Sequence, residues 1–304
     1  MSAFELHILG CGSALPTRRH NPSAQIVNVR GKLFLIDCGE GTQLQIRNNK
    51  LNFNKIQDVF LSHLHGDHCF GLIGLISTMG MLGRNNPLRI HGPKDTEQIF
   101  RPLLDYFCAE LPFEVCFDAY EKGVHTKIFE DSSIEVFTLP LKHRVPTSGF
   151  LFREKAKPRH IRKDMLAFYG IPLNAIPSLQ EGADYTTEEG EVISNERLTM
   201  PATTPKSYAY CSDTAWKESL IPLITGVDLL YHEATFLETH LKRAQATQHS
   251  TAAQAGRMAR LAEVKALLIG HYSARYSDEQ VFLDEARVEF SNVRLAMEGL
   301  KLDI

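Results

Sequence analysis

Several features of secreted and membrane proteins are missing from this sequence. The chain has six cysteines, but no two of them have the C-x-x-C spacing, and several lie within apolar runs. This predicts buried free thiols in a reducing compartment. No apolar run approaches the ~20 residues of a membrane span, and the first residues carry no basic segment typical of a signal peptide. We therefore expect a cytoplasmic protein without a membrane partner.

A strong charge of one sign is missing as well. The formal net charge is only −3, from 33 lysines and arginines against 36 aspartates and glutamates. The chain as a whole therefore does not attract polyanions, so any anionic partner must be bound by a local patch, and we expect no DNA partner. With 304 residues, 43% of them hydrophobic, the chain can bury a large core as one large domain or two small ones.

The densest group of chemically active side chains is the run His63-Leu64-His65-Gly66-Asp67-His68. The residues before it are apolar, as in a buried strand, and those after it recur at helical spacing. The run is therefore predicted to be a strand-to-helix loop, in which Gly66 permits a sharp turn. Imidazole nitrogen and carboxylate oxygen are ligands that zinc accepts. The alternative is a solvated polar turn, in which these residues would have no common function.

Four further polar residues follow predicted strands farther along the chain: His143, Asp213, His249 and His271. In α/β proteins the loops after the carboxyl ends of strands converge at one edge, where ligands bind. We therefore predict two metal ions at this edge. Their ligands would be His63, His65 and His143 for one ion, Asp67, His68 and His271 for the other, and Asp213 as the bridge. Taken alone, His143 or His271 is equally consistent with an ordinary hydrogen-bonded histidine.

A pair of close divalent ions suits hydrolysis of a phosphodiester. Such ions polarise the electrophile and lower the pKa of a shared water, which makes hydroxide available near neutral pH. Asp67 lies beside that nucleophile and is placed to accept its proton. His249 is not needed as a ligand, and Glu233 could orient it and keep it charged, so His249 is a candidate to protonate the leaving oxygen. In the alternative, Glu233 and His249 only brace the metal ligands.

The order of the predicted elements indicates the architecture. Strands and helices come in two successive batches, each with strands before helices, which predicts an α/β protein built as a four-layer αβ/βα sandwich. The last strand is expected at 293–297. The helix from about 252 to 262 is expected to have Ser250 as its N-cap, and Ser277 to Gln280 have the sequence of a capping box for the next helix.

Residues 153–205 interrupt this order. The segment begins with a basic run, continues through an apolar stretch and ends in acidic residues, and prolines divide it. Connections this long between core strands are usually functional or disordered. We expect an arm that protrudes from a single domain spanning residues 1–304. Its basic residues, among them Arg159, Arg162 and Lys163, are suited to contact the phosphates of a folded RNA, although a solvated charged surface explains them equally well.

These residues together resemble a known superfamily. The motif His63-x-His65-x-Asp67-His68, followed by His143, Asp213 and His271, resembles that of the metallo-β-lactamase superfamily across nearly the whole chain. Lactamases, thioesterases and nucleases share that motif. Four further stretches resemble the ribonuclease Z family, whose members process the 3′ ends of tRNA: Pro16-Thr17-x-x-x-Asn21, Asp37-Cys38-Gly39-Glu40-Gly41-Thr42-Gln43, His232-Glu233-Ala234-Thr235 and His249-Ser250-Thr251.

The resemblance implies a metallo-β-lactamase fold with the ligands assigned above, holding two Zn²⁺ per subunit, with Mn²⁺ or another divalent ion as the alternative. It implies that Asp67 acts as base and His249 as acid in cleaving precursor tRNA 3′ of the discriminator nucleotide, which leaves a 3′-hydroxyl. It also implies a homodimer in which the arm of one subunit grips tRNA that is cleaved at the other. We expect Arg18, Arg19 and Asn21 in the first loop to contact this substrate.

Two departures from the family pattern concern the grip on tRNA. The first loop has His20 where the family usually has arginine, and residues 171–177 of the arm lack the Gly-Pro element that is common there. Two other functions are compatible with the sequence. One is a small-molecule hydrolase of the same fold, acting on a thioester, lactam or phosphodiester. The other is a non-catalytic tRNA-binding protein, which the complete ligand set disfavours.

Overall fold

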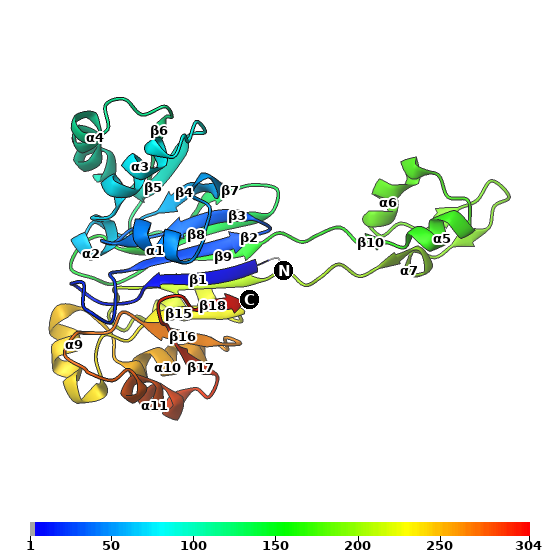
Figure 1. Cartoon of the computed structure of the whole chain (residues 1–304). Helices are drawn as coiled ribbons and strands as arrows, with labels where there is room; N and C mark the ends of the chain where they lie inside the picture. Colours follow the sequence, from blue (N-terminus) through cyan, green and yellow to red (C-terminus); the bar gives the residue numbers. More distant parts are fainter. Residues whose placement is uncertain (1–3) are drawn as a thin grey trace. The chain divides into compact units, whose positions relative to one another are not determined.

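Two seven-stranded sheets form the larger of two units in the computed structural model, which describes residues 4–304 (Figure 1). This unit contains the chain up to Arg153 and from Lys206 onward, and the second unit contains Glu154–Pro205. The bounds of the second unit lie within one residue of the interruption that the sequence predicts. Within residues 4–304, no helix combines the length and the apolar composition needed to cross a membrane.

The first sheet has the strand order β18-β1-β2-β3-β4-β5-β6. Its strands are β1 (Phe4–Gly10), β2 (Ala24–Val29), β3 (Lys32–Ile36), β4 (Ile56–Phe60), β5 (Leu88–Pro93), β6 (Val115–Tyr120) and β18 (Lys301–Asp303). The prediction that the last strand lies at 293–297 is wrong, because β18 follows it and pairs antiparallel with β1. Only Leu302 is buried in this short strand, so its sequence carries too little hydrophobic pattern to predict it.

The second sheet has the order β17-β16-β15-β14-β9-β8-β7. Its strands are β7 (Lys127–Glu130), β8 (Ile134–Pro140), β9 (Ser148–Glu154), β14 (Ser207–Cys211), β15 (Leu229–Glu233), β16 (Leu267–Gly270) and β17 (Val293–Leu295). The four strands β14 to β17 run parallel. Their carboxyl ends therefore lie at one edge of the sheet, where α/β proteins place their ligands.

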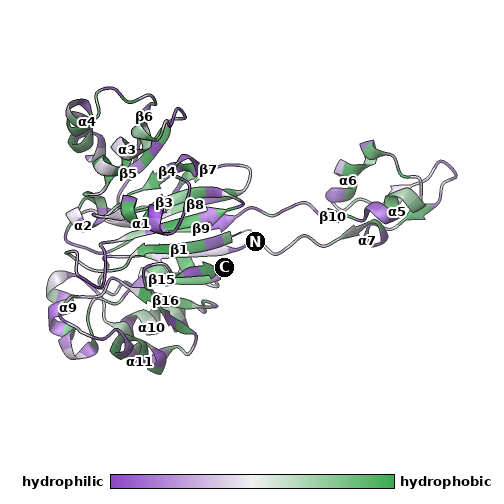
Figure 2. Cartoon of the chain, viewed as in Figure 1, coloured by the Kyte–Doolittle hydropathy of each residue, from purple (hydrophilic) through white to green (hydrophobic). Residues whose placement is uncertain are grey.

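The two sheets stack on each other with helices outside, which confirms the predicted four-layer sandwich (Figure 1). Side chains of β3 alternate between two cores: Phe34 and Ile36 pack between the sheets, and Leu33 and Leu35 pack under helices. Each such side chain contributes roughly 1.5–3 kcal/mol on burial. Figure 2 shows the strands of both sheets as predominantly hydrophobic, as expected for sheets that are covered on both faces.

The helices of this unit cover the outer faces of the sheets or connect strands. They are α1 (Thr42–Asn48), α2 (Gly66–Cys69), α3 (Leu72–Met81), α4 (Thr96–Phe107), α8 (Ile221–Ile224), α9 (Leu241–Thr247), α10 (Ala252–Leu261) and α11 (Gln280–Glu289), with short 3₁₀ turns η1 (Phe53–Lys55), η3 (Glu218–Leu220) and η4 (Glu238–His240). Residues of α1, α3 and α4 pack on the first sheet, and residues of α10 and α11 pack on the second.

Two predicted helix caps are wrong. The N-cap of α10 is Thr251, whose hydroxyl accepts from the Gln254 backbone in a complete capping box, whereas the Ser250 hydroxyl donates to the carbonyl of Thr214 at 2.6 Å. The expected capping box of Ser277 and Gln280 does not form at α11, whose N-cap residue is Glu279; the Asp278 carboxylate accepts from the backbone N–H of Gln280 at 2.9 Å. The carboxylate of Glu279 forms ion pairs with the side chains of Arg19 and His20.

The second unit has its own small core of buried apolar side chains: Leu166, Ile171, Leu179, Ile193 and Leu198. Its elements are β10 (His160–Ile161), α5 (Lys163–Phe168), η2 (Leu173–Ala175), α6 (Ile176–Gln180), β11 (Tyr185–Thr186), β12 (Val192–Ile193), α7 (Asn195–Leu198) and β13 (Thr199–Met200). The strands form two short antiparallel pairs, β10 with β13 and β11 with β12. The unit is therefore folded.

Candidate metal centre

The histidine loop connects β4 to α2, as predicted, and two glycines determine its path. A Cβ on Gly66 would lie 2.3 Å from the ring of Phe70, and a Cβ on Gly71 would lie 2.1 Å from the carbonyl oxygen of Gly39. Gly71 therefore excludes any side chain, because it meets backbone, whereas a side chain at Gly66 would require the exposed Phe70 ring to move. Asp67 and His68 lie in the short helix α2, and Gly71 separates α2 from α3. The downstream apolar residues belong mainly to α3, the helix that their spacing predicts.

Asp37, which directly follows β3, anchors this loop. Its buried carboxylate accepts hydrogen bonds from the Ser62 backbone at 2.7 Å, the Ser62 hydroxyl at 2.9 Å and the Tyr210 hydroxyl at 2.7 Å, and one of its oxygens lies 2.7 Å from Nδ1 of His68. The next residue, Cys38, donates its backbone N–H to the carbonyl of His68. The turn that begins at Asp37 therefore supports the histidine loop, and Asp37 is a site residue that the sequence reasoning above does not identify. An aspartate at the end of a buried strand is the signal that pointed to it.

Strand ends bring the distant residues to this loop. Asp213 follows β14, His271 follows β16, and His143 lies shortly after β8. Asp213 and His271 have left-handed backbones, with φ of 58° and 62°, and Asp37 has φ of 55°. Such conformations cost about 1–3 kcal/mol each in residues other than glycine and tend to cluster at functional sites. The surrounding packing therefore holds these side chains in place against backbone strain.

Four side chains form the first cluster: His63, His65, His143 and Asp213, with donor atoms all within 4.8 Å of one another. Nε2 of His63 lies 3.0 Å, and Nε2 of His143 lies 3.4 Å, from Nδ1 of His65. Oδ2 of Asp213 lies 3.5 Å from His143 and 3.7 Å from His63. Three imidazole nitrogens thus converge beside one carboxylate oxygen.

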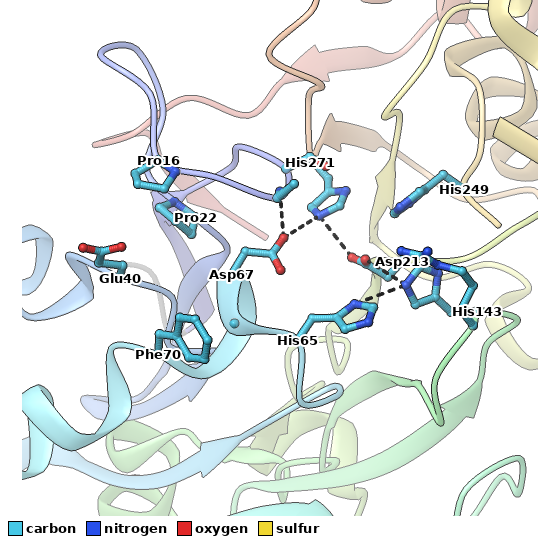
Figure 3. Close-up of a pocket in the computed structure, with 14 residues that line it drawn as sticks. Pro16, Pro22, Glu40, His65, Asp67, Phe70, His143, Asp213, His249 and His271 are labelled. Atoms are coloured by element: carbon cyan, nitrogen blue, oxygen red, sulfur yellow. Dashed lines mark hydrogen bonds and ion pairs between the residues drawn. The ribbon is translucent and has the colours of Figure 1, made fainter. Parts of the chain in front are cut away.

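A second cluster contains Asp67, His68 and His271, whose donor atoms also lie within 4.8 Å of one another. Oδ2 of Asp67 lies 3.7 Å from Nε2 of His68 and 3.7 Å from Nε2 of His271. Oδ1 of Asp213 lies 3.1 Å from each of the same two nitrogens. Asp213 therefore directs one oxygen to each cluster, which is the position that a bridging ligand requires (Figure 3).

The hydrogen bonds around the clusters fit a pair of divalent cations. The nitrogen that faces away from the clusters has a partner in four histidines: the Ser62 hydroxyl for His63, Asp37 for His68, the Gln248 carbonyl for His143 and the Thr235 hydroxyl for His271. Such partners orient metal-binding histidines. The inward Nε2 atoms of His68 and His271 are buried without a hydrogen bond. Their nearest polar neighbour is Oδ1 of Asp213, 3.1 Å from each, and a metal ion held between these groups would satisfy both nitrogens.

Burial and neighbouring charges set the protonation of these groups. Burial holds the pKa of His63 well below its usual range, and it also lowers the pKa of His65 and His143. Burial alone would raise the pKa of Asp213, but the adjacent His271 and His68 hold that pKa well below its usual value. Neutral imidazoles and ionised carboxylates are the forms that bind metal.

His249 lies beside the two clusters but is paired with a buried carboxylate. Its Nδ1 lies 2.9 Å from Oε1 of Glu233, which also accepts from the backbone of Thr214 at 2.5 Å. Burial opposes the charged imidazole, yet the Glu233 carboxylate outweighs it and raises the pKa of His249 to about 9. His249 is therefore an imidazolium near neutral pH and has a proton to give.

A pocket of about 430 Å³ exposes these groups to a ligand (Figure 3). Asp67, His65, His143, Asp213, His249 and His271 line it, together with Pro16, Pro22, Glu40 and Phe70. One oxygen of Asp67 accepts a hydrogen bond from the backbone N–H of Ala14 at 2.8 Å, which fixes this carboxylate at the pocket wall.

The other predicted site residues lie outside the clusters. Arg18 is exposed, and Arg19 donates to the carbonyls of Ser277 and Tyr276 and pairs with Glu279 at 2.8 Å. The backbone of Asn21 donates to Glu298 at 2.8 Å. In the second unit, Arg159 donates to the Thr199 hydroxyl at 2.7 Å, Arg162 lies 3.6 Å from Asp164, and Lys163 begins α5. Their contact with substrate stays a prediction.

The fold and the paired clusters define the class of protein. The structure is similar to the short form of human tRNase Z, with a TM-score of 0.71, 23% identity and 99% of each chain covered. It is also similar to the metallo-β-lactamase fold protein YhfI from Bacillus subtilis, with a TM-score of 0.69, 19% identity and 99% of each chain covered. The chain therefore has the metallo-β-lactamase fold.

Sequence relatives narrow this class to one family. The chain is 55% identical to a ribonuclease Z of Parabacteroides distasonis and 53% identical to one of Bacteroides fragilis, each over 304 residues and 100% of both chains. Residues 4–105 also match a family described as anti-Pycsar protein Apyc1, which covers about a third of the chain. The chain belongs to the ribonuclease Z family, as the sequence motifs predicted.

Proposed function

We propose that this chain is a hydrolytic endoribonuclease that cleaves precursor tRNA 3′ of the discriminator nucleotide and leaves a 3′-hydroxyl. The observation that carries the proposal is the pair of His/Asp clusters joined by Asp213, with His249, which is paired with the buried Glu233, on the wall of the same pocket. The names of the relatives, ribonuclease Z and tRNase Z, support RNA and tRNA as substrate.

The two clusters are suited to hold two divalent ions per subunit. His63, His65 and His143 would bind one, Asp67, His68 and His271 the other, and Asp213 both. Nitrogen and oxygen donors of this kind fit Zn²⁺, and Mn²⁺ is the alternative. When bound, such ions polarise the phosphodiester and make water available as a nucleophile near neutral pH.

Asp67 and His249 would move the protons. The neighbouring His68 and His271 keep the pKa of Asp67 below its usual value despite its burial, so the group is a carboxylate that can accept a proton from the attacking water. His249 has a proton to give and lies across the pocket from Asp67 (Figure 3). An in-line displacement needs its acceptor and donor on opposite sides of the phosphorus, and the separation of these two side chains suits that geometry.

Mapping of the cut tests the proposal. Metal-loaded protein is incubated with a precursor tRNA, and the products are sequenced at both new ends; a 3′-hydroxyl at the discriminator nucleotide is expected. Asp67→Ala should abolish cleavage and leave tRNA binding largely intact. Hydrolysis of small esters without any cut in the RNA would favour the small-molecule hydrolase, and full activity of Asp67→Ala would contradict the role of this residue.

We further propose that residues 154–205 are a tRNA-binding arm inserted in one metallo-β-lactamase-like domain, with Arg159, Arg162 and Lys163 among its phosphate contacts. Arg153 pairs with Ser207 across β9 and β14, so a short turn can replace residues 155–205 without breaking the sheet. Deletion should then abolish tRNA cleavage and spare small-ester hydrolysis. Unchanged processing of tRNA by the deleted protein would refute the role of the arm.

The family resemblance supports a cytoplasmic homodimer in which the arm of one subunit serves the site of the other. Mixed dimers test this arrangement. A subunit without the arm and an Asp67→Ala subunit are each expected to be inactive alone, and co-refolding them should restore cleavage at the intact site. If the arm serves its own subunit, the mixture stays inactive.

A further inference from the structure

A second pocket, of about 330 Å³, adjoins the metal pocket beside His249. The two pockets share Ser13, Ala14, Arg144 and His249. The remaining wall of the second pocket comes from α9 and from the segments that follow β15 and β16, with Phe236, Arg243 and Arg275 as its largest side chains. A ligand that reaches His249 can therefore extend into this second space.

Three arginines give this pocket a positive charge. Arg144, Arg243 and Arg275 are exposed, and none of them forms an ion pair with another residue of the described part of the chain, 4–304. Some surface arginines of the same unit have acidic partners, such as Arg89 with Asp58 and Arg260 with Glu289; what sets Arg144, Arg243 and Arg275 apart is that they line one pocket. Guanidinium groups without carboxylate partners are available to phosphate oxygens, which they bind in bidentate geometry.

The sequence positions of these arginines tie the pocket to the catalytic edge. Arg144 directly follows His143, Arg275 lies in the loop that begins with His271, and Arg243 lies on α9, which ends just before His249. The same strand ends and turns that place the site histidines therefore place the three positive charges. The three charges therefore lie at one pocket beside the site histidines and are not dispersed over the surface.

The polarity of the RNA follows from the proposed roles, on which this inference rests. Cleavage that leaves a 3′-hydroxyl expels the 3′ oxygen of the discriminator nucleotide. His249 is paired with Glu233, lines both pockets and lies across the metal pocket from Asp67, so it is the group placed to face that oxygen. The discriminator nucleotide must therefore lie on the His249 side, and the next phosphate in that direction is the one on its own 5′ oxygen. We infer that Arg144, Arg243 and Arg275 bind this phosphate, so that the pocket fixes the RNA on the 5′ side of the cut.

A double-mutant cycle between protein and RNA tests the assignment. The double variant Arg243→Gln/Arg275→Gln removes two charges, and a methylphosphonate 5′ of the discriminator nucleotide removes the charge of the phosphate. Lys242→Gln, a loss of charge at the exposed neighbour of Arg243 on α9, is the matched control. Dissociation constants are measured by fluorescence anisotropy with the full-length Asp67→Ala protein, so that binding is observed without cleavage.

We expect the double variant to bind unmodified RNA about tenfold more weakly and its salt dependence to fall by about one unit of slope. The methylphosphonate should weaken binding about tenfold in the parent and clearly less in the double variant, which keeps only Arg144 of the three arginines. A methylphosphonate at the first phosphate within the trailer should weaken both proteins equally. Because none of these side chains makes an ion pair, folding should be unchanged, and Arg275→Gln alone provides an independent comparison.

Three results would overturn the inference. They are an equal methylphosphonate penalty in the parent and the double variant, coupling to the trailer phosphate in place of the 5′ one, and an equal loss of binding in Lys242→Gln. These results can be distinguished from an error in the proposed function itself. If the proposed function is wrong, the protein with Asp67 intact does not cut precursor tRNA at all.

Discussion

Replacing Glu233 with Gln tests most directly whether His249 acts as the general acid. The Glu233 carboxylate lies 2.9 Å from Nδ1 of His249 and outweighs the burial that opposes the charged imidazole. An amide of the same shape removes the negative charge and keeps a hydrogen-bonding group. The pKa of His249 should therefore fall from about 9 to its ordinary value of 6.5 or below.

The size of the effect follows from that shift. A difference of about 2.5 pKa units corresponds to about 3 kcal/mol of stabilisation of the imidazolium by its surroundings. At pH 8, a group with a pKa of 9 is about 90% protonated, and one with a pKa of 6.5 is about 3% protonated. Cleavage by Glu233→Gln at pH 8 should therefore be about 30-fold slower than that of the unmodified protein, and nearly equal to it below pH 6.

The assay is the pH profile of kcat/KM on a precursor tRNA from pH 5.5 to 10. The descending limb of the unmodified enzyme should lie near pH 9, and that of Glu233→Gln should lie near 6.5 or lower. Glu238→Gln is the control, since Glu238 accepts from the Thr251 hydroxyl and makes no contact with His249. If Glu233 and His249 only brace the metal ligands, the variant loses activity equally at every pH and its limb does not move, which would refute the role of His249 as acid.

Two further predictions concern the supports of the site. Asp37→Ala removes the partner of His68 Nδ1, so metal affinity should fall about 10–100-fold in calorimetric titrations. The control Tyr210→Phe keeps the Asp37 carboxylate and should change metal affinity much less. Equal losses in the two variants would contradict the anchoring role of Asp37. His20 contacts Glu298 at 3.0 Å and Glu279 at 2.9 Å, and these carboxylates raise its pKa although burial opposes the charge. The ion pairs of His20 should stabilise the folded protein fully below pH 6.5, the ordinary pKa of histidine. This stabilisation should be lost as the pH rises through the raised pKa of His20. The difference in unfolding free energy between the unmodified protein and His20→Gln, from urea titrations, should therefore shrink as the pH rises, and a difference that grows with pH would exclude this ion-pair role.

His20 also shows how a departure from a sequence pattern acquires meaning in the structure. The resemblance marked this position as unusual but gave no partner for it. In the fold, His20 joins the first loop to the segments of Glu279 and Glu298, with Cys11 Sγ 3.4 Å away. The contact depends on residues near the opposite end of the chain, so no local pattern predicts it.

The sequence by itself determined the histidine loop, the two-batch order of strands and helices, the separate segment after residue 153, and the family. These features are local: donor type, hydrophobic period and motif spacing are written in consecutive residues. Only the tertiary structure decided that Asp37 anchors His68, that Asp213 directs one oxygen to each cluster, and that three arginines border His249. Those facts depend on which strands become neighbours and on the left-handed backbones at their ends, and both are determined by packing between residues far apart in the chain.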